Sequence, residues 1–218
     1  MRTDAELKQD VIDELKWEPM ISDAAIRVEV KAGVVTLSGY AGSLREKLDA
    51  ELAAESVFGV IGVVQKIEVK LPGVAERSDE DITRAVENAL EWNAYVPHEK
   101  IKVHIQNGWV TLSGDVDFNY QKDEASDAVC CLLGVKGIYN LIKVKTSPKP
   151  SDIESRIESA FRRHAVEDAR RGLTVKTSGS KAILSGVVHS YADKRAAEQA
   201  ALDATGISEV ENNLVVIS

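Results

Sequence analysis

The sequence contains no long apolar run and only two cysteines. Its longest nearly apolar stretch, from Val57 to Val64, includes two glycines and is far shorter than the ~20 residues that cross a bilayer. We therefore expect no transmembrane span. Cys130 and Cys131 are adjacent in a predicted helix, where a bridge between neighbours would distort the backbone. We expect two reduced thiols rather than a disulfide framework.

Residue patterns typical of enzyme sites are also scarce. There is no CxxC pair, no nucleophile elbow and no glycine-rich phosphate loop. The four histidines lack metal-ligand spacing; they are His98, His104, His164 and His189. We expect no catalytic residue, no metal site and no cofactor.

Positive charge is in the minority. The chain has 27 basic and 35 acidic residues, a formal net charge of −8. Nucleic acid requires a basic footprint, so we expect no nucleic-acid partner. The first ten residues carry charges throughout and lack the apolar centre of a signal peptide. They predict a cytoplasmic protein; the alternative is a periplasmic protein whose true start lies upstream.

One seven-residue pattern is present three times. It reads GVVTLSG at 33–39, GWVTLSG at 108–114 and SKAILSG at 180–186. A second anchor keeps the same spacing, as Gly59-Val60, Gly134-Val135 and Gly206-Ile207. Two anchors at matching spacing indicate an internal repeat. We expect three tandem domains, at residues 1–71, 78–146 and 151–218.

Each copy reads helix, strand, strand, helix, strand. Apolar residues at helical spacing predict the first helix, alternating residues predict a hairpin, and small residues mark a second helix that lies close to the sheet. The expected hairpin turns are Ala32-Gly33, Asn107-Gly108 and Ser178-Gly179. Because a helix joins the second strand to the third, these two strands should be parallel. The predicted fold class is α+β, with three tandem α-β-β-α-β domains, each a three-stranded mixed sheet with two helices on one face.

This order of elements, the G-x-V-T-L-S-G strand and the later V-x-N-x-I/L-x-V strand resemble the BON domain (bacterial OsmY and nodulation). The resemblance covers nearly the whole chain in three copies, although the first copy has Gln65 in place of the asparagine. It implies a non-catalytic module of envelope or osmotic-stress physiology that binds anionic phospholipid or an envelope protein. The alternative is a cytoplasmic protein-interaction or self-association module, including a homo-oligomer. Potassium binding, known for one relative, is a third reading.

Two groups of aromatic residues are candidates for binding. Trp17 and Trp92 occupy matching positions at the end of the first helix. In a lipid-binding relative the equivalent helix contacts the membrane, so the resemblance points to Trp92 and Tyr95. The alternative is that both tryptophans cover an edge of the core. Trp109 has the register of the open sheet face, where it would pack against another copy or a second chain, or line a ligand groove.

The remaining candidates are basic or small residues. Arginines are concentrated at Arg162, Arg163, Arg170 and Arg171. They would hold anionic headgroups or form a solvated helix end. Glycines close strand two in each copy, at Gly39, Gly114 and Gly186, for backbone freedom or for close approach of a headgroup or ion.

Amides lie in register with core positions of the last strand, at Gln65, Asn140 and Asn212. Buried amides need hydrogen-bond partners. We expect each amide to tie its strand to the backbone of a neighbouring loop; the alternative is a ligand or potassium site.

Overall fold

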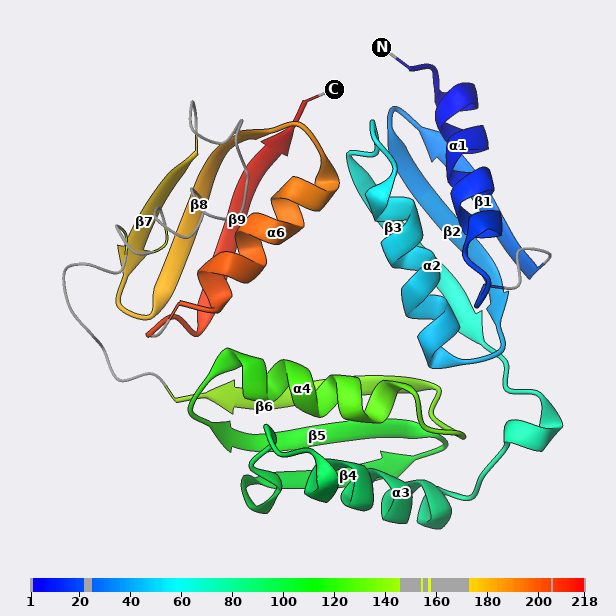
Figure 1. Cartoon of the computed structure of the whole chain (residues 1–218), viewed down its shortest axis with the longest axis vertical. Coiled ribbons are helices and arrows are strands. Elements are labelled where there is room, and N and C mark those ends of the chain that lie inside the picture. The colour runs from blue at the N-terminus through cyan, green and yellow to red at the C-terminus, as the bar shows by residue number, and fades with distance from the viewer. Residues whose placement is uncertain are drawn as a thin grey trace.

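The computed structural model describes residues 2–21, 25–145, 154, 157, 173–204 and 206–217. Three similar units, called domains 1, 2 and 3, follow one another along the chain (Figure 1). Domain 1 consists of α1 (Asp4–Trp17), β1 (Ile26–Lys31), β2 (Val34–Ala41), α2 (Leu44–Ser56) and β3 (Gly62–Val69). Domain 2 consists of α3 (Asp79–Trp92), η3 (His98–Lys100), β4 (Ile101–Gln106), β5 (Trp109–Val116), α4 (Asn119–Cys130) and β6 (Gly137–Val144). The described part of domain 3 contains β7 (Thr174–Ser178), β8 (Lys181–Val188), α6 (Tyr191–Leu202) and β9 (Glu209–Val216). The short helix η2 (Gly73–Ala75) lies between domains 1 and 2.

Each domain contains a separate three-stranded sheet whose second strand is central. The first two strands are antiparallel and the last two are parallel. The predicted α+β fold of mixed sheets is therefore confirmed. The register also repeats, because the buried leucines of strand two lie opposite the aligned amides of strand three. These pairs are Leu37 with Gln65, Leu112 with Asn140, and Leu184 with Asn212.

Each domain has its own hydrophobic core. Leu37, Leu112 and Leu184 are fully buried in three different clusters, so equivalent positions have equivalent surroundings. Small residues on the second helices are buried against the sheets, as the sequence predicts; they include Ala50, Ala54, Ala125, Ala197 and Ala201. Ile157 is buried in the third cluster, whereas most of the segment that the sequence predicts as the first helix of domain 3 lies outside the described residues.

An acidic residue at the start of the first helix holds the hairpin turn. The Asp4 carboxylate accepts hydrogen bonds from the backbone N–H groups of Ala32 and Gly33, at 2.8 and 3.0 Å. Asp79 does the same at Asn107 and Gly108. In these two turns both central residues have positive φ, as a type I′ turn requires.

The third hairpin turn differs by one residue from the prediction. Ser178 belongs to β7 and pairs with Lys181 across the hairpin, so the turn consists of Gly179 and Ser180. Gly179 has a φ of 63° and takes the place of Ala32 and Asn107 in the other copies. The expected Ser178-Gly179 turn is therefore wrong, because the residue that tolerates positive φ has moved to the first turn position.

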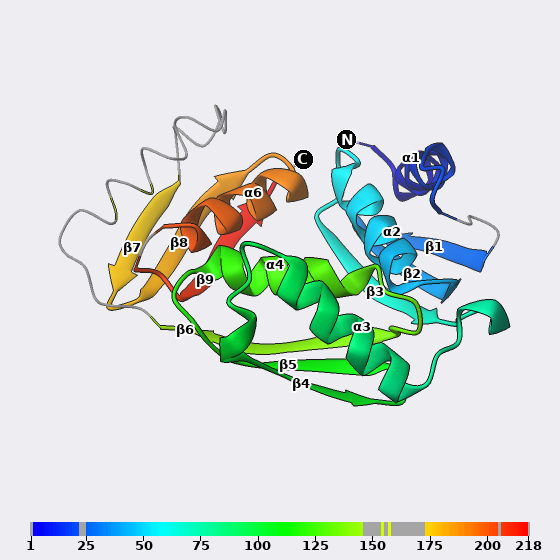
Figure 2. The same ribbon diagram turned by 60° about the horizontal axis from the view of Figure 1, so that its bottom comes forward.

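The three domains surround a common centre. The second helices α2, α4 and α6 lie on the sides of their domains that face this centre, while α1 lies on an outer side, as both views show (Figures 1 and 2). The N- and C-terminal ends lie next to each other, because Arg2 and Asp4 line the same pocket as Val216 and Ile217. In the described part of the chain, no helix is long and apolar enough to cross a bilayer.

Candidate functional site

The aligned amides bind a helix rather than a loop. In all three copies the side-chain N–H donates to a backbone carbonyl one turn into the second helix. The distances are 3.2 Å from Gln65 to Lys47, 2.8 Å from Asn140 to Lys122, and 3.1 Å from Asn212 to Lys194. The amide oxygen accepts from the backbone N–H two residues further along the strand. The expectation of a loop partner is wrong, because the second helix lies directly over the last strand.

The strand-two glycines are required by backbone geometry. Gly39, Gly114 and Gly186 have φ values of 116°, 142° and 137°, which side-chain-bearing residues rarely adopt. A Cβ atom at Gly114 would lie 2.0 Å from the carbonyl oxygen of Lys100, and one at Gly39 would lie 2.1 Å from that of Ala25. The close approach that Gly39 and Gly114 permit is therefore to the residue just before the first strand of the hairpin. The expectation that these glycines close strand two is wrong, because the strand continues for two residues beyond each of them.

Aromatic side chains gather at one end of domain 2. Trp92, the last residue of α3, is 87% exposed, and Tyr95 is 65% exposed. The amide of Asn93 donates to Glu124 in the middle of α4 at 3.2 Å, and Lys100 contacts Asp117, just before α4, at 2.7 Å. At the start of α4, Phe118 and Tyr120 stack with ring centroids 5.6 Å apart and are also exposed. We call Trp92, Tyr95, Phe118 and Tyr120 the aromatic end of domain 2.

Domain 1 has a smaller version of this feature. Trp17 is 81% exposed and Met20 is 72% exposed. The idea that Trp17 and Trp92 cover an edge of the core is wrong, since a side chain this exposed covers little. Phe118 and Tyr120 were missed by the sequence reasoning. Their signal was a departure from the repeat, because domain 1 has Ser43 and Arg45 at these positions and domain 3 has Ser190 and Ala192.

Trp109 lies on the side of its sheet away from the helices. Its neighbours Val110 and Leu112 are fully buried, while Trp109 is 40% exposed. Its ring stacks on Tyr139 with centroids 5.0 Å apart. Gly137 makes room for the ring, since a Cβ there would lie 2.2 Å from it. Within the described residues the domains approach one another through their second helices, so packing of this face against another copy in the same chain is not observed.

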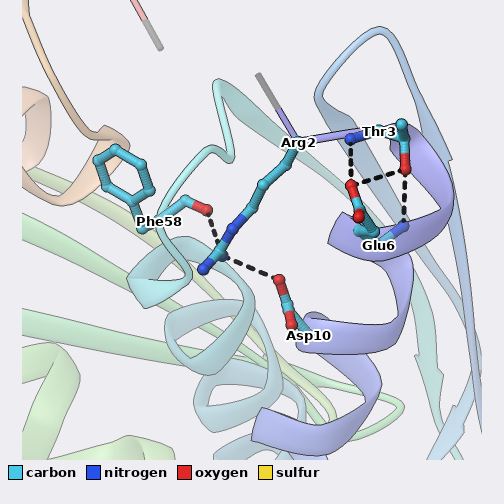
Figure 3. A network of polar contacts seen from close by, with 5 residues as sticks. All are labelled: Arg2, Thr3, Glu6, Asp10 and Phe58. Atoms are coloured by element: carbon cyan, nitrogen blue, oxygen red, sulfur yellow. Dashed lines mark hydrogen bonds and ion pairs between the residues drawn. The ribbon is translucent and has the colours of Figure 1, made fainter.

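A pocket of about 470 Å³ lies between domains 1 and 3. Its polar wall is occupied by internal contacts (Figure 3). The Arg2 guanidinium contacts Asp10 at 2.8 Å and donates to the Phe58 carbonyl at 3.1 Å. Glu6 and Thr3 form a capping box, whose hydrogen bonds lower the pKa of Glu6. The rest of the pocket lining, which a ligand could contact, is largely apolar. It is formed by Leu7, Ile61, Val216 and Ile217.

Among the described residues, the two cysteines do not form a disulfide. Both cysteines are free thiols, and burial together with Cys131 raises the pKa of Cys130 to about 11. Among the residues that the structure describes, no group of three or more His, Cys, Asp or Glu side chains is arranged to hold a metal ion. The arginines Arg162, Arg163, Arg170 and Arg171 lie outside the described residues.

Known proteins to which this chain is similar include one curated protein and two structures of CdsD. The osmotically-inducible protein Y of Escherichia coli K12 is 33% identical over 131 residues, which cover 57% of this chain and 64% of that protein. The C-terminal domain of CdsD, a structural protein of the type III secretion system of Chlamydia trachomatis, is 18% identical with a TM-score of 0.25 and complete coverage of both chains. A second CdsD structure is 16% identical with a TM-score of 0.27, covering 96% of this chain and 91% of that one.

The family model of the BON domain matches this sequence three times, at residues 3–70, 78–146 and 150–218. Each match contains one of the three sheets, with its buried leucine and its strand-to-helix amide. The chain therefore belongs to the BON domain family and carries three copies of the domain.

Proposed function

We propose that this protein is a non-catalytic BON protein that binds phospholipid membrane surfaces in envelope or osmotic-stress physiology, through the aromatic end of domain 2. The observation that carries the proposal is the exposure of Trp92 at 87% and of Tyr95 at 65%. Tryptophan and tyrosine favour the boundary between water and hydrocarbon, because their rings are apolar and their N–H or O–H groups are polar. The stacked rings of Phe118 and Tyr120 would add a second apolar contact at the same end of the domain.

The stress role is supported by the osmotically-inducible relative, to which the chain is similar over 64% of that protein's length. The membrane-surface role agrees with a chain that offers exposed aromatics but no spanning helix among its described residues. Attachment through a few side chains gives reversible binding, since each aromatic contributes only about 1.5–3 kcal/mol when fully withdrawn from water.

Vesicle co-sedimentation tests the proposal. Full-length protein is mixed with anionic phospholipid vesicles at about 0.15 M salt, which screens the repulsion between the lipid and a chain of net charge −8. Replacing Trp92 and Tyr95 by serine is expected to weaken partitioning by at least roughly tenfold, which corresponds to ~1.4 kcal/mol. Val74→Ser is the matched control, because Val74 is equally exposed, at 86%, but lies in η2. Absence of wild-type binding, or equal binding by the double variant, would rule the proposal out.

A second candidate is a protein-interaction or self-association surface on the outer face of the domain 2 sheet. It is favoured by the Trp109–Tyr139 stack together with Leu141, which is 61% exposed. Such an apolar surface is typical of an interface. Trp109→Lys would place a charge in its middle, so light scattering should report a lower mass if the wild-type chain self-associates there. An unchanged mass, with unchanged partner binding, removes this candidate.

A further inference from the structure

The second helices of the three domains contact one another head to tail. The first residue of α2, Leu44, is buried in the core cluster of domain 2, and Arg45 lies beside Cys130 at the end of α4. Asp123, in the first half of α4, contacts Gln199 in the second half of α6. The start of each helix thus approaches the end of another, and the third such contact joins α6 to α2.

The junction between α6 and α2 is centred on one ion pair. Arg195 of α6 contacts the carboxylate of Glu55 near the end of α2. The Glu55 side chain is only 10% exposed, whereas that of Arg195 is 54% exposed. Glu51 lies one turn earlier on α2; burial and the charge of Glu55 raise its pKa, and Arg195 counters part of this effect. A single guanidinium of domain 3 therefore compensates crowded carboxylates of domain 1.

The junction between α6 and α4 is also polar and is weaker. The Gln199 amide donates to Asp123 at 3.3 Å, and Asp123 also accepts from Asn119 within its own helix at 2.8 Å. Burial raises the pKa of Asp123. Domain 3 therefore approaches both other domains at acidic positions, Glu51 and Glu55 on α2 and Asp123 on α4.

The junction between domains 1 and 2 is different in kind. Leu44 is 7% exposed within the core cluster of domain 2, and Val69 at the end of β3 packs against the same cluster. Apolar burial of this type depends little on ionic strength. An ion pair whose arginine is 54% exposed contributes little to stability and is weakened further by salt. The polar contacts described for domain 3 should therefore break more easily than the apolar contact between domains 1 and 2.

From this contrast we infer that domains 1 and 2 form a permanent pair whose α2 and α4 provide an acidic docking surface for α6, and that domain 3 docks there reversibly through Arg195. The occupant of the surface is domain 3 of the same chain. High ionic strength releases domain 3, and low ionic strength returns it. This inference is independent of the membrane proposal.

Small-angle X-ray scattering of the full chain tests it through the radius of gyration. Salt is raised from about 0.05 M to about 1 M, which shortens the Debye length to ~3 Å. The wild type should be compact at low salt and should expand as salt rises. Arg195→Glu should be expanded at all salt concentrations. The charge-swapped variant, Glu55→Arg with Arg195→Glu, should be compact again at low salt.

The matched control is Arg84→Glu, which breaks an exposed ion pair within α3 and should leave the radius of gyration unchanged. Circular dichroism establishes that each variant is folded, and Arg195→Gln replaces Arg195→Glu if the reversal unfolds domain 3. The inference fails if the wild type is already expanded at low salt, or if its size does not change with salt. It also fails if Arg195→Glu remains compact or if the charge swap does not restore compactness.

Discussion

Gly114 occupies a backbone conformation that no other residue fits well. Its φ is 142°, and an added Cβ would lie 2.0 Å from the Lys100 carbonyl oxygen. Gly62, in β3, is a matched control, because an added Cβ there meets nothing within 4 Å and its φ is not positive. Gly114→Ala should therefore lower the free energy of unfolding by at least about 2 kcal/mol, while Gly62→Ala should change it by less than about 0.5 kcal/mol.

Urea unfolding followed by tryptophan fluorescence measures the difference, since Trp92 and Trp109 report on domain 2, which contains Gly114, and Trp17 reports on domain 1, which contains Gly62. Equal urea midpoints for Gly114→Ala and the wild type would contradict this prediction, because they would show that β4 and β5 can move apart without loss of stability. The glycine positions were predictable from sequence because every copy has a glycine at the same place in strand two, although the strand continues for two residues beyond it. What the sequence did not specify was the atom that the glycine approaches.

The aligned amides are a second case in which the sequence predicted a contact but not the atom on its other side. Their register with core positions of the last strand predicted a polar tie, and each amide donates a hydrogen bond in the structure. The partner was predicted wrongly, since periodicity identifies the face of a strand but not which neighbour lies above it. Gln65 reaches the equivalent carbonyl in spite of its longer side chain, so the first copy preserves the contact with a different residue.

The start of α3 depends on an ionised side chain. Ser78 caps the helix by accepting from the backbone N–H of Asp81 at 3.1 Å, and its hydroxyl donates to the Asp81 carboxylate at 2.7 Å. These bonds, with the ion pair to Arg84, lower the pKa of Asp81. A lowered pKa means that the folded state favours the charged form. The resulting stability is present above the unfolded pKa and is lost as pH falls through the folded pKa.

We therefore expect Asp81→Asn to be less stable than the wild type at neutral pH. The difference should shrink as acid protonates the wild-type carboxylate. Urea midpoints at a series of pH values measure this, with Glu87→Gln as the control because Glu87 is an exposed residue in the middle of the same helix. A deficit that stays constant down to strongly acidic pH would contradict the proposed role of the charge.

At the scale of the whole molecule, the sequence predicted the number and type of domains but not how they meet. The residues that build each domain fold are repeated in the sequence, so the repeat predicted the domains. The contacts between domains use positions at which the copies differ: Leu44 aligns with Asn119 and Tyr191, and Arg195 aligns with Leu48 and Asp123. A search for similarity between the copies does not detect residues that differ from one copy to the next. The aromatic end of domain 2 was incompletely predicted for the same reason.

Because the two ends of the described chain are neighbours, they could be joined and the chain could begin at another residue with the same fold. Arg2 and Ile217 line one pocket, so a short glycine-serine bridge would join them with little loop-closure cost. New ends could be opened in the exposed connection around Gly73, where an added Cβ meets nothing within 4 Å. Such a circular permutant, which begins with domain 2 and finishes with domain 1, should keep the far-ultraviolet circular dichroism and the low-salt radius of gyration of the parent. The order of synthesis would change, while the arrangement in space would not.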